Sequence, residues 1–196
     1  MEVQWFPGHM AKAMREMKED IGLIDLVIEV VDARIPASSR NPELDRIAAG
    51  KSRLIIFNKT DLSDETENER WLKYFAEQGL VCVRMNSKTG LGVKDVNRAV
   101  DTACAKKLER DRSRGIKERP VRAMVVGIPN VGKSAFINSF AGRSVAKAAN
   151  KPGVTRGKQW VRLGKKLELM DTPGVMWPKF EGENVRSEER RVGKEC

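Results

Sequence analysis

The residues from Gly127 to Ser134 have the spacing Gly-x-x-x-x-Gly-Lys-Ser, which is typical of a phosphate-binding loop. The two glycines allow a tight turn that directs backbone N–H groups at phosphates. Lys133 can reach the β- and γ-phosphates as a catalytic group, and the Ser134 hydroxyl is suited to ligate Mg²⁺. The pattern therefore predicts binding of a nucleoside triphosphate. The expected contacts of the loop are Asn130, Val131, Gly132, Lys133, Ser134 and Ala135.

Two segments further along the chain could hold Mg²⁺ and contact the γ-phosphate. Asp171 and Gly174 form Asp-x-x-Gly, in which the carboxylate supports the metal ion and the glycine N–H contacts the phosphate. This motif alone is usually a turn, but its position after the phosphate loop favours the metal site. Thr155, between the two motifs, could complete the Mg²⁺ coordination, although Thr in such a loop is often only a turn residue.

A third motif predicts that the base is guanine. In "NKTD", from Asn58 to Asp61, the Asp61 carboxylate could accept hydrogen bonds from the guanine N1–H and N2–H₂ groups, which adenine lacks. Asn58 would fix the loop and the stem of Lys59 would pack along the base. The tetrapeptide is commonly a turn, but here it follows an apolar run. The expected guanine contacts are Asn58, Lys59, Thr60 and Asp61, with Asn86, Ser87 and Lys88 of "NSKTG" as a second loop.

Buried strands and amphipathic helices alternate along the chain and would position these motifs. This alternation predicts an α/β fold with a doubly wound, mostly parallel sheet. Met10, Met14, Met17 and Ile21 mark one apolar helix face, and Asn41 is the expected cap of a short helix. The expected strands are 26–33, 53–57, 80–87 and 121–128, with a hairpin around Gly164. The expected longer helices are 10–21, 64–79, 93–112 and 133–142.

The order of the motifs predicts a circularly permuted P-loop GTPase fold. An ordinary small GTPase begins with the phosphate loop and ends with the guanine-reading motifs, whereas here the guanine-reading motifs come first. Permutation is tolerated where the ends of a domain lie close together at the surface. The expected organisation is an N-terminal segment and helix (1–22) and the GTPase domain (23–185). Within that domain we expect a guanine-reading half (23–105), a basic connector (106–120) and a phosphate-binding half (121–185).

The sequence resembles the circularly permuted GTPases, in particular those that assemble the bacterial large ribosomal subunit. The resemblance covers residues 1–185 and rests on the segments "WFPGHMAKAMREM", "VVDARIP", "NKTDL", "GIPNVGKS", "KPGVTRGKQW" and "DTPGVMWP". It implies hydrolysis of GTP to GDP and phosphate, stimulated by the large subunit late in its maturation. It also implies a C-terminal helical RNA-binding domain, before which this sequence stops.

The resemblance also suggests how water is activated. Many GTPases have Gln directly after Asp-x-x-Gly, but here the residue is Val175, which cannot polarise water. The resemblance assigns that task to His9, whose ordinary pKa suits it, although a surface or helix-capping role is the alternative. Related GTPases use an Asn at the position of Asn130 to hold K⁺ in place of an arginine finger. A loop-stabilising role for Asn130 is the alternative.

Clustered positive charge points to a polyanionic partner. The net charge is +10, and the segments 106–122 and 150–166 are rich in Lys and Arg, the second having no acidic residue. A solvated surface is the alternative, but clustering favours RNA. The predicted partners are therefore the large ribosomal subunit precursor and its rRNA.

The remaining composition predicts a soluble, intracellular protein, which we expect to be a cytoplasmic monomer without a membrane partner. No run approaches the ~20 apolar residues of a membrane span, and the three cysteines show no metal-like spacing and fit a reducing compartment. Residues 186–196, "RSEERRVGKEC", resemble a translated sequencing-adapter oligonucleotide, and we expect this tail to be non-native.

Three functions compete at this level. The first is a GTPase switch that uses GTP, Mg²⁺ and K⁺. The second is a nucleotide-gated binding module for the pre-ribosome, without useful turnover in this shortened form. The third, an ATPase or kinase, is disfavoured by "NKTD".

Overall fold

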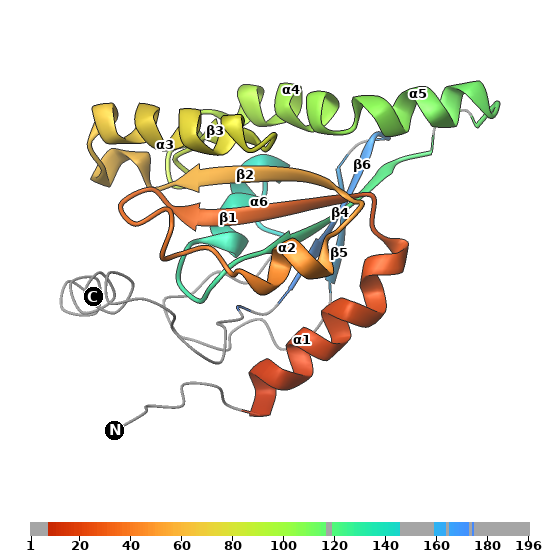
Figure 1. Cartoon of the computed structure of the whole chain (residues 1–196), viewed down its shortest axis with the longest axis horizontal. Helices are drawn as coiled ribbons and strands as arrows, with labels where there is room; N and C mark the ends of the chain where they lie inside the picture. Colours follow the sequence, from red (N-terminus) through yellow and green to blue (C-terminus); the bar gives the residue numbers. More distant parts are fainter. Residues whose placement is uncertain (1–7, 117–118, 146–158, 164, 173, 175–196) are drawn as a thin grey trace.

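The computed structural model describes residues 8–116, 119–145, 159–163, 165–172 and 174, and at residues 8–10 and 159 it describes the backbone alone. The described residues form a six-stranded sheet with the order β3-β2-β1-β4-β6-β5 (Figure 1). The strands are β1 (Leu26–Asp32), β2 (Ser52–Asn58), β3 (Val81–Arg84), β4 (Val121–Val126), β5 (Gln159–Leu163) and β6 (Leu167–Asp171). The α-helices are α1 (Gly8–Asp20), α2 (Glu43–Ile47), α3 (Glu65–Glu77), α4 (Val93–Ala103), α5 (Ala105–Ser113) and α6 (Lys133–Ala141). Two short 3₁₀ helices are η1 (Ile21–Leu23) and η2 (Thr60–Leu62).

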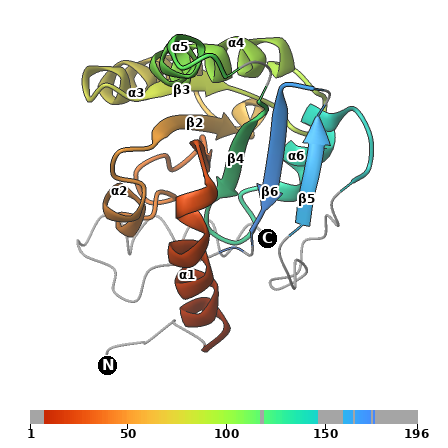
Figure 2. The same ribbon diagram turned by 90° about the vertical axis from the view of Figure 1, so that its right-hand side faces the viewer.

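The predicted mostly parallel α/β sheet is confirmed. Neighbouring strands from β3 across to β6 are all parallel, whereas β5 runs antiparallel to β6 as the predicted hairpin. The chain passes from β1 outward to β2 and β3, and returns to place β4 on the other side of β1 (Figure 2). The strand order therefore reverses between β1 and β4, and ligands of such sheets bind at the carboxyl ends of the strands at this point.

Alternate residues of the central strands supply two apolar faces, as expected of a sheet covered on both sides. Leu26, Ile28 and Val30 of β1 belong to the cluster that includes residues of α4 and α6. The next positions along β1, Val27 and Val31, belong to the clusters that include residues of α1, α2 and α3. The sheet is therefore the middle layer of three, and its strand ends are left at the two rims.

Side chains cap two of the helices that follow strands. The side-chain Oδ1 of Asn41 accepts a hydrogen bond from the Glu43 N–H at 3.0 Å, which satisfies one of the free donors at the start of α2. The Asp64 carboxylate accepts the Glu67 N–H at 3.0 Å and caps α3. The predicted methionine face is confirmed where it is described, because Met14 and Met17 of α1 are buried.

The prediction of one long helix over 93–112 is wrong. The structure has two helices, α4 and α5, joined at Cys104, whose φ of −96° and ψ of 3° depart from helical values. Cys104 is fully buried in the core, whereas α5 has no buried residue. The Cys104 N–H still donates to Val100 O, and its carbonyl accepts from Leu108 N–H. The helical backbone angles are therefore interrupted at Cys104, whereas the hydrogen-bond pattern continues through it.

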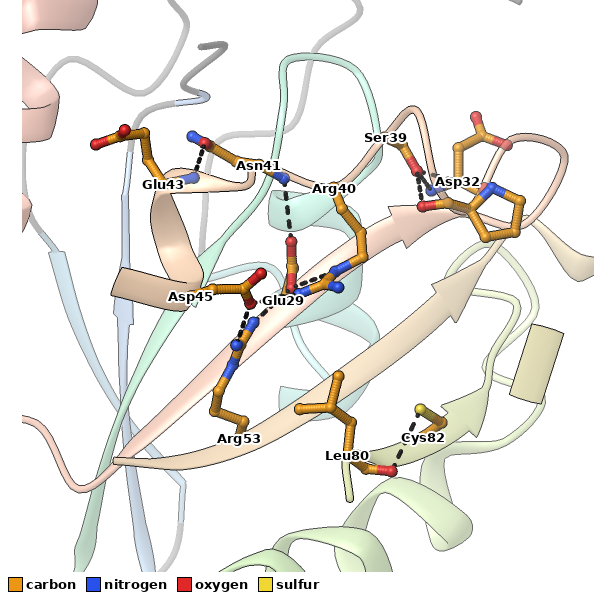
Figure 3. Close-up of polar contacts among 11 residues, drawn as sticks. Glu29, Asp32, Ser39, Arg40, Asn41, Glu43, Asp45, Arg53, Leu80 and Cys82 are labelled. Atoms are coloured by element: carbon orange, nitrogen blue, oxygen red, sulfur yellow. Dashed lines mark hydrogen bonds and ion pairs between the residues drawn. The ribbon is translucent and has the colours of Figure 1, made fainter. Parts of the chain in front are cut away.

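A buried carboxylate in β1 anchors the segment that follows this strand (Figure 3). Glu29 is 1% exposed, and its Oε2 accepts hydrogen bonds from Arg40 Nε and Arg53 Nη2, both at 3.1 Å. Its Oε1 accepts the Asn41 N–H at 3.2 Å. Because a buried charge that loses its partners is costly, these contacts fix the segment 33–42 against the sheet.

Within the described residues, no helix has the length and apolar character needed to cross a membrane.

Candidate functional site

The carboxyl ends of β1, β2, β4 and β6 lie along one rim of the sheet, and the predicted motifs follow them. β2 leads into Lys59, β4 into Gly127, and β6 ends at Asp171. Because β1 separates β2 from β4, the two predicted halves of the site flank the point where the strand order reverses. Motifs that are far apart in the sequence are thus placed along the same rim.

The segment 127–132 is a tight loop that ends on the N-terminus of α6. Gly127 and Gly132 have φ values of 153° and 94°, and Asn130 also has a positive φ of 63°. A Cβ at Gly132 would lie 2.5 Å from the side-chain nitrogen of Asn58, so only glycine fits there. The loop therefore has the conformation and the helix N-terminus that favour an anion.

Lys133, at the first position of α6, turns its amine back onto this loop. Its Nζ donates hydrogen bonds to the carbonyl oxygens of Gly127 and Ile128, both at 3.1 Å. Burial lowers the pKa of Lys133 to about 8, although the charge of Asp171 acts in the opposite direction. The buried amine is therefore ready to exchange backbone carbonyls for phosphate oxygens.

Ser134 and Asp171 bring two hard oxygen donors together. The Ser134 hydroxyl donates to Asp171 Oδ2 at 3.4 Å, from α6 to the end of β6. The next residue, Thr172, donates its hydroxyl to the carbonyl of Val125 at 2.7 Å and ties this strand end to β4. A hydroxyl and a carboxylate suit Mg²⁺, which prefers a few protein oxygens together with phosphate and water. The donor set therefore fits the predicted metal.

Gly174 lies directly against the phosphate loop. A Cβ at this position would be 2.8 Å from the backbone nitrogen of Pro129 and 2.9 Å from Lys133 Nζ. The structure thus brings Asp-x-x-Gly next to the loop, within reach of a phosphate held there.

Asn58 connects the two halves of the site. Its side-chain Nδ2 donates to the carbonyl of Val131 at 2.8 Å, and its Oδ1 accepts the Ser87 N–H at 3.0 Å. Asn58 is 3% exposed; its bond to Val131 is buried and its bond from Ser87 is half-buried. One side chain therefore joins the guanine motif, the second guanine loop and the phosphate loop.

The other residues of "NKTD" surround this connection. Lys59 has a left-handed conformation with φ of 62°, and its Nζ lies 3.0 Å from Asp32 Oδ2. Thr60 donates its hydroxyl to the carbonyl of Met85 at 3.3 Å. Asp61 lies in η2 with an exposed side chain, which leaves its carboxylate accessible to a ligand.

The second guanine loop is organised by Asn86. Its Oδ1 accepts the N–H groups of Lys88 at 2.9 Å and Thr89 at 3.2 Å, and its own N–H donates to Leu91 O. Ser87 Oγ is buried and has no hydrogen-bond partner in the described structure. The hydroxyl is therefore a free polar group beside Asn58.

The structure does not describe two residues that the sequence analysis considered, and it describes a third only in part. Thr155 and Val175 lie outside the described residues. His9 lies in the first turn of α1, where the backbone alone is described. The described site therefore contains the predicted guanine and phosphate groups and the Ser134–Asp171 pair.

Sequence reasoning missed one carboxylate at the site, that of Asp32. It ends β1 beside Asn58 in the parallel register and contacts the side chain of Lys59. Arg34 donates to both of its oxygens, from Nε at 3.0 Å and from Nη2 at 2.9 Å. The available signal was the position of an acidic residue at the end of an apolar strand next to the strand that carries "NKTD".

Comparisons with known proteins agree with this geometry. Residues 122–195 match the family model described as 50S ribosome-binding GTPase. The chain is 48% identical over 185 residues to ribosome biogenesis GTPase A of Bacillus cereus, covering 94% of this chain and 62% of the relative. It is 32% identical to ribosome biogenesis GTPase A of Thermotoga maritima, covering 97% and 66%. The crystal structure of GNP-bound YlqF from T. maritima has a TM-score of 0.67 at 28% identity, covering 93% of this chain and 66% of that one. The chain thus spans less than two thirds of the length of these relatives.

Proposed function

We propose that this chain is a circularly permuted GTPase of the group named ribosome biogenesis GTPase A, and that it binds GTP and hydrolyses it to GDP and phosphate, because it is 48% and 32% identical to two proteins of that name. The observation that carries the proposal is the hydrogen bond from Asn58 to Val131 O, which joins a guanine-reading motif to a phosphate loop. The relatives' name, ribosome biogenesis GTPase A, and the matching family description, 50S ribosome-binding GTPase, support a role in ribosome biogenesis. We further propose that the protein is a cytoplasmic monomer that acts as a switch late in assembly of the large ribosomal subunit.

Within this function the guanine half reads the base. The Asp61 carboxylate accepts the N1–H and N2–H₂ groups of guanine, and the Lys59 stem packs on the face of the base. Asn58, Thr60, Asn86, Ser87 and Lys88 shape the two loops around the base. This role is supported by the exposed carboxylate of Asp61 next to the buried amide of Asn58.

The phosphate half holds the triphosphate and the metal. Asn130, Val131, Gly132 and Ala135 present backbone groups to the phosphates, Lys133 neutralises their charge, and Gly174 contacts the γ-phosphate. Ser134 and Asp171, with Thr155, hold Mg²⁺, which supplies electrostatic stabilisation of the transferring phosphoryl group when bound. The contact between Ser134 and Asp171 supports this arrangement.

Hydrolysis requires a group that orients water, because the residue after Gly174 is a valine. We assign this step to His9, brought into place by the ribosomal subunit, and the charge stabilisation to K⁺ held by Asn130. The positive φ of Asn130 on an exposed loop is compatible with a carbonyl ligand directed at the phosphates.

The ribosomal partner would meet a basic surface. Arg110 and Arg112 of α5 and Arg114 directly after it are exposed, as are Lys165 and Lys166 directly before β6. Asp25 contacts Lys107 of α5 and accepts the Arg122 N–H of β4. The neighbouring residue of β4, Val121, donates its N–H to the carbonyl of Lys166 at 2.8 Å, so both groups lie at the start of β4. This surface lies at the opposite rim from the nucleotide and suits the phosphates of rRNA.

Measurement of GTP hydrolysis with and without large ribosomal subunits, in K⁺ and in Na⁺, tests the function. We expect slow intrinsic turnover that subunits and K⁺ accelerate, and loss of the subunit effect in His9→Ala. Turnover that is the same in both salts would remove the K⁺ role. If GTP binds but subunits never accelerate its loss, the chain acts as a nucleotide-gated binding module instead.

A further inference from the structure

The Asp32 carboxylate contacts the side-chain amine of Lys59, the lysine of the guanine motif. The parallel register pairs Asp32 with Asn58, and the N–H of the next residue, Ala33, donates to Asn58 O at 2.9 Å. The carboxylate is 4% exposed, and its Oδ2 accepts a hydrogen bond from Lys59 Nζ at 3.0 Å. The contact therefore joins the ends of two adjacent strands inside the site.

The carboxylate itself is held firmly. Arg34 donates three hydrogen bonds to it, from its backbone N–H, Nε and Nη2. The Asp32 N–H donates to Ser39 Oγ at 2.9 Å, and the segment 33–42 is fixed by the buried Glu29 (Figure 3). Burial opposes ionisation of Asp32, but Arg34 and Lys59 outweigh it and hold its pKa below the ordinary value. Asp32 is thus an anion held in place by Arg34, and it accepts a hydrogen bond from the Lys59 amine.

A partner that holds the Lys59 amine has a consequence for binding. A lysine stem loses much rotamer freedom when it is ordered. A stem already held in place would form a wall for a purine without losing that freedom on binding, and preorganisation of this kind raises affinity.

We propose that Asp32 is a positioning residue for guanine-nucleotide binding, which acts by holding Lys59 Nζ so that the lysine stem forms one wall of the base pocket. The inference rests on the proposed function. Two other roles of the Asp32–Lys59 contact predict different effects on nucleotide affinity. A purely structural pair would stabilise the fold without changing nucleotide affinity, and a latch that holds Lys59 away from the base would weaken binding.

Nucleotide affinity in a double-mutant cycle separates these roles. Fluorescent GDP is titrated into the wild-type chain, Asp32→Asn, Lys59→Met and the double variant. We expect Asp32→Asn to weaken binding about 5- to 20-fold and the double variant to bind no more weakly than Lys59→Met, because contacting residues are coupled. The control is Asp45→Asn, which removes a carboxylate that pairs with Arg40 and Arg53 away from the strand ends. It should remain within about twofold of wild type.

A second measurement needs no nucleotide. The rate at which an acylating reagent modifies Lys59, followed by mass spectrometry, should rise in Asp32→Asn and stay unchanged in Asp45→Asn. Unchanged GDP affinity in Asp32→Asn, tighter binding, or losses that multiply in the double variant would each overturn the proposal. Failure of the wild-type chain to bind guanine nucleotides would instead overturn the proposed function, and the proposal with it, and the modification rates would still report whether Asp32 holds Lys59.

Discussion

Asn58 Nδ2 donates a hydrogen bond to the carbonyl of Val131 over 2.8 Å, between residues 73 positions apart in the sequence. The same side chain accepts the Ser87 N–H through Oδ1. Since the bond to Val131 is buried and the bond from Ser87 is half-buried, the guanine and phosphate segments are parts of one structure before any nucleotide binds. Nucleotide affinity and local stability should therefore depend on the same residue.

We expect Asn58→Ala to lower the free energy of unfolding by about 1–3 kcal/mol, because it removes the partner of the buried Val131 carbonyl and of the half-buried Ser87 N–H. GDP affinity should fall together with stability. Urea denaturation without nucleotide and GDP titration provide the two values. Asn97→Ala is the control, because Asn97 makes one exposed hydrogen bond within α4, and its unfolding free energy should stay within about 0.5 kcal/mol.

Gly174→Ala should separate the two nucleotide states. Its Cβ would press on Pro129 and Lys133, where the γ-phosphate would approach the loop. We therefore expect GTP-analogue affinity to fall at least about tenfold while GDP affinity changes little. Competition titrations measure both, and Gly22→Ala is the control because nothing lies within 4 Å of a Cβ there. Equal losses for GDP and the GTP analogue would contradict the placement of Gly174 at the γ-phosphate.

Lys133 should make nucleotide binding depend on pH in the alkaline range. In the free protein burial lowers its pKa to about 8, so the amine loses its proton as the pH rises through that value. Bound phosphates favour the charged form, so binding above pH 8 must take up a proton and affinity must decrease with rising pH. Calorimetry in buffers of different ionisation enthalpy measures this uptake. Proton release on binding at pH 8.5 would contradict the prediction, and Lys133→Ala should abolish the uptake.

Much of the fold could be predicted because strong local signals agree with its long-range structure. The apolar runs that became β1, β2 and β4 predicted buried parallel strands, and the motif order predicted which strand each loop follows. The interruption of the helix at Cys104 could not be predicted, because the helical pattern continues on both sides of it. It depends on how far the core extends, which is a property of the packed structure.

The candidate site, like the fold, could be predicted only in part from the sequence. Motif spacing pointed to Asn58, Lys133, Ser134 and Asp171, which the structure brings to one rim. Asp32 was missed because its contact with Lys59 depends on the register between β1 and β2. The sequence of a single strand does not determine which residues of another strand it pairs with.

The central claim is that one guanine nucleotide binds across both halves. The most direct test is equilibrium competition for labelled GTP by GTP, ATP and XTP, in the wild-type chain, Asp61→Asn and the exposed control Asp101→Asn. We predict one nucleotide per chain, displaced by GTP but not by ATP, with Asp61→Asn alone shifting preference to XTP because xanthine offers an acceptor in place of the N2–H₂ donor. Displacement of GTP by ATP, or unchanged GTP preference in Asp61→Asn, would contradict the account.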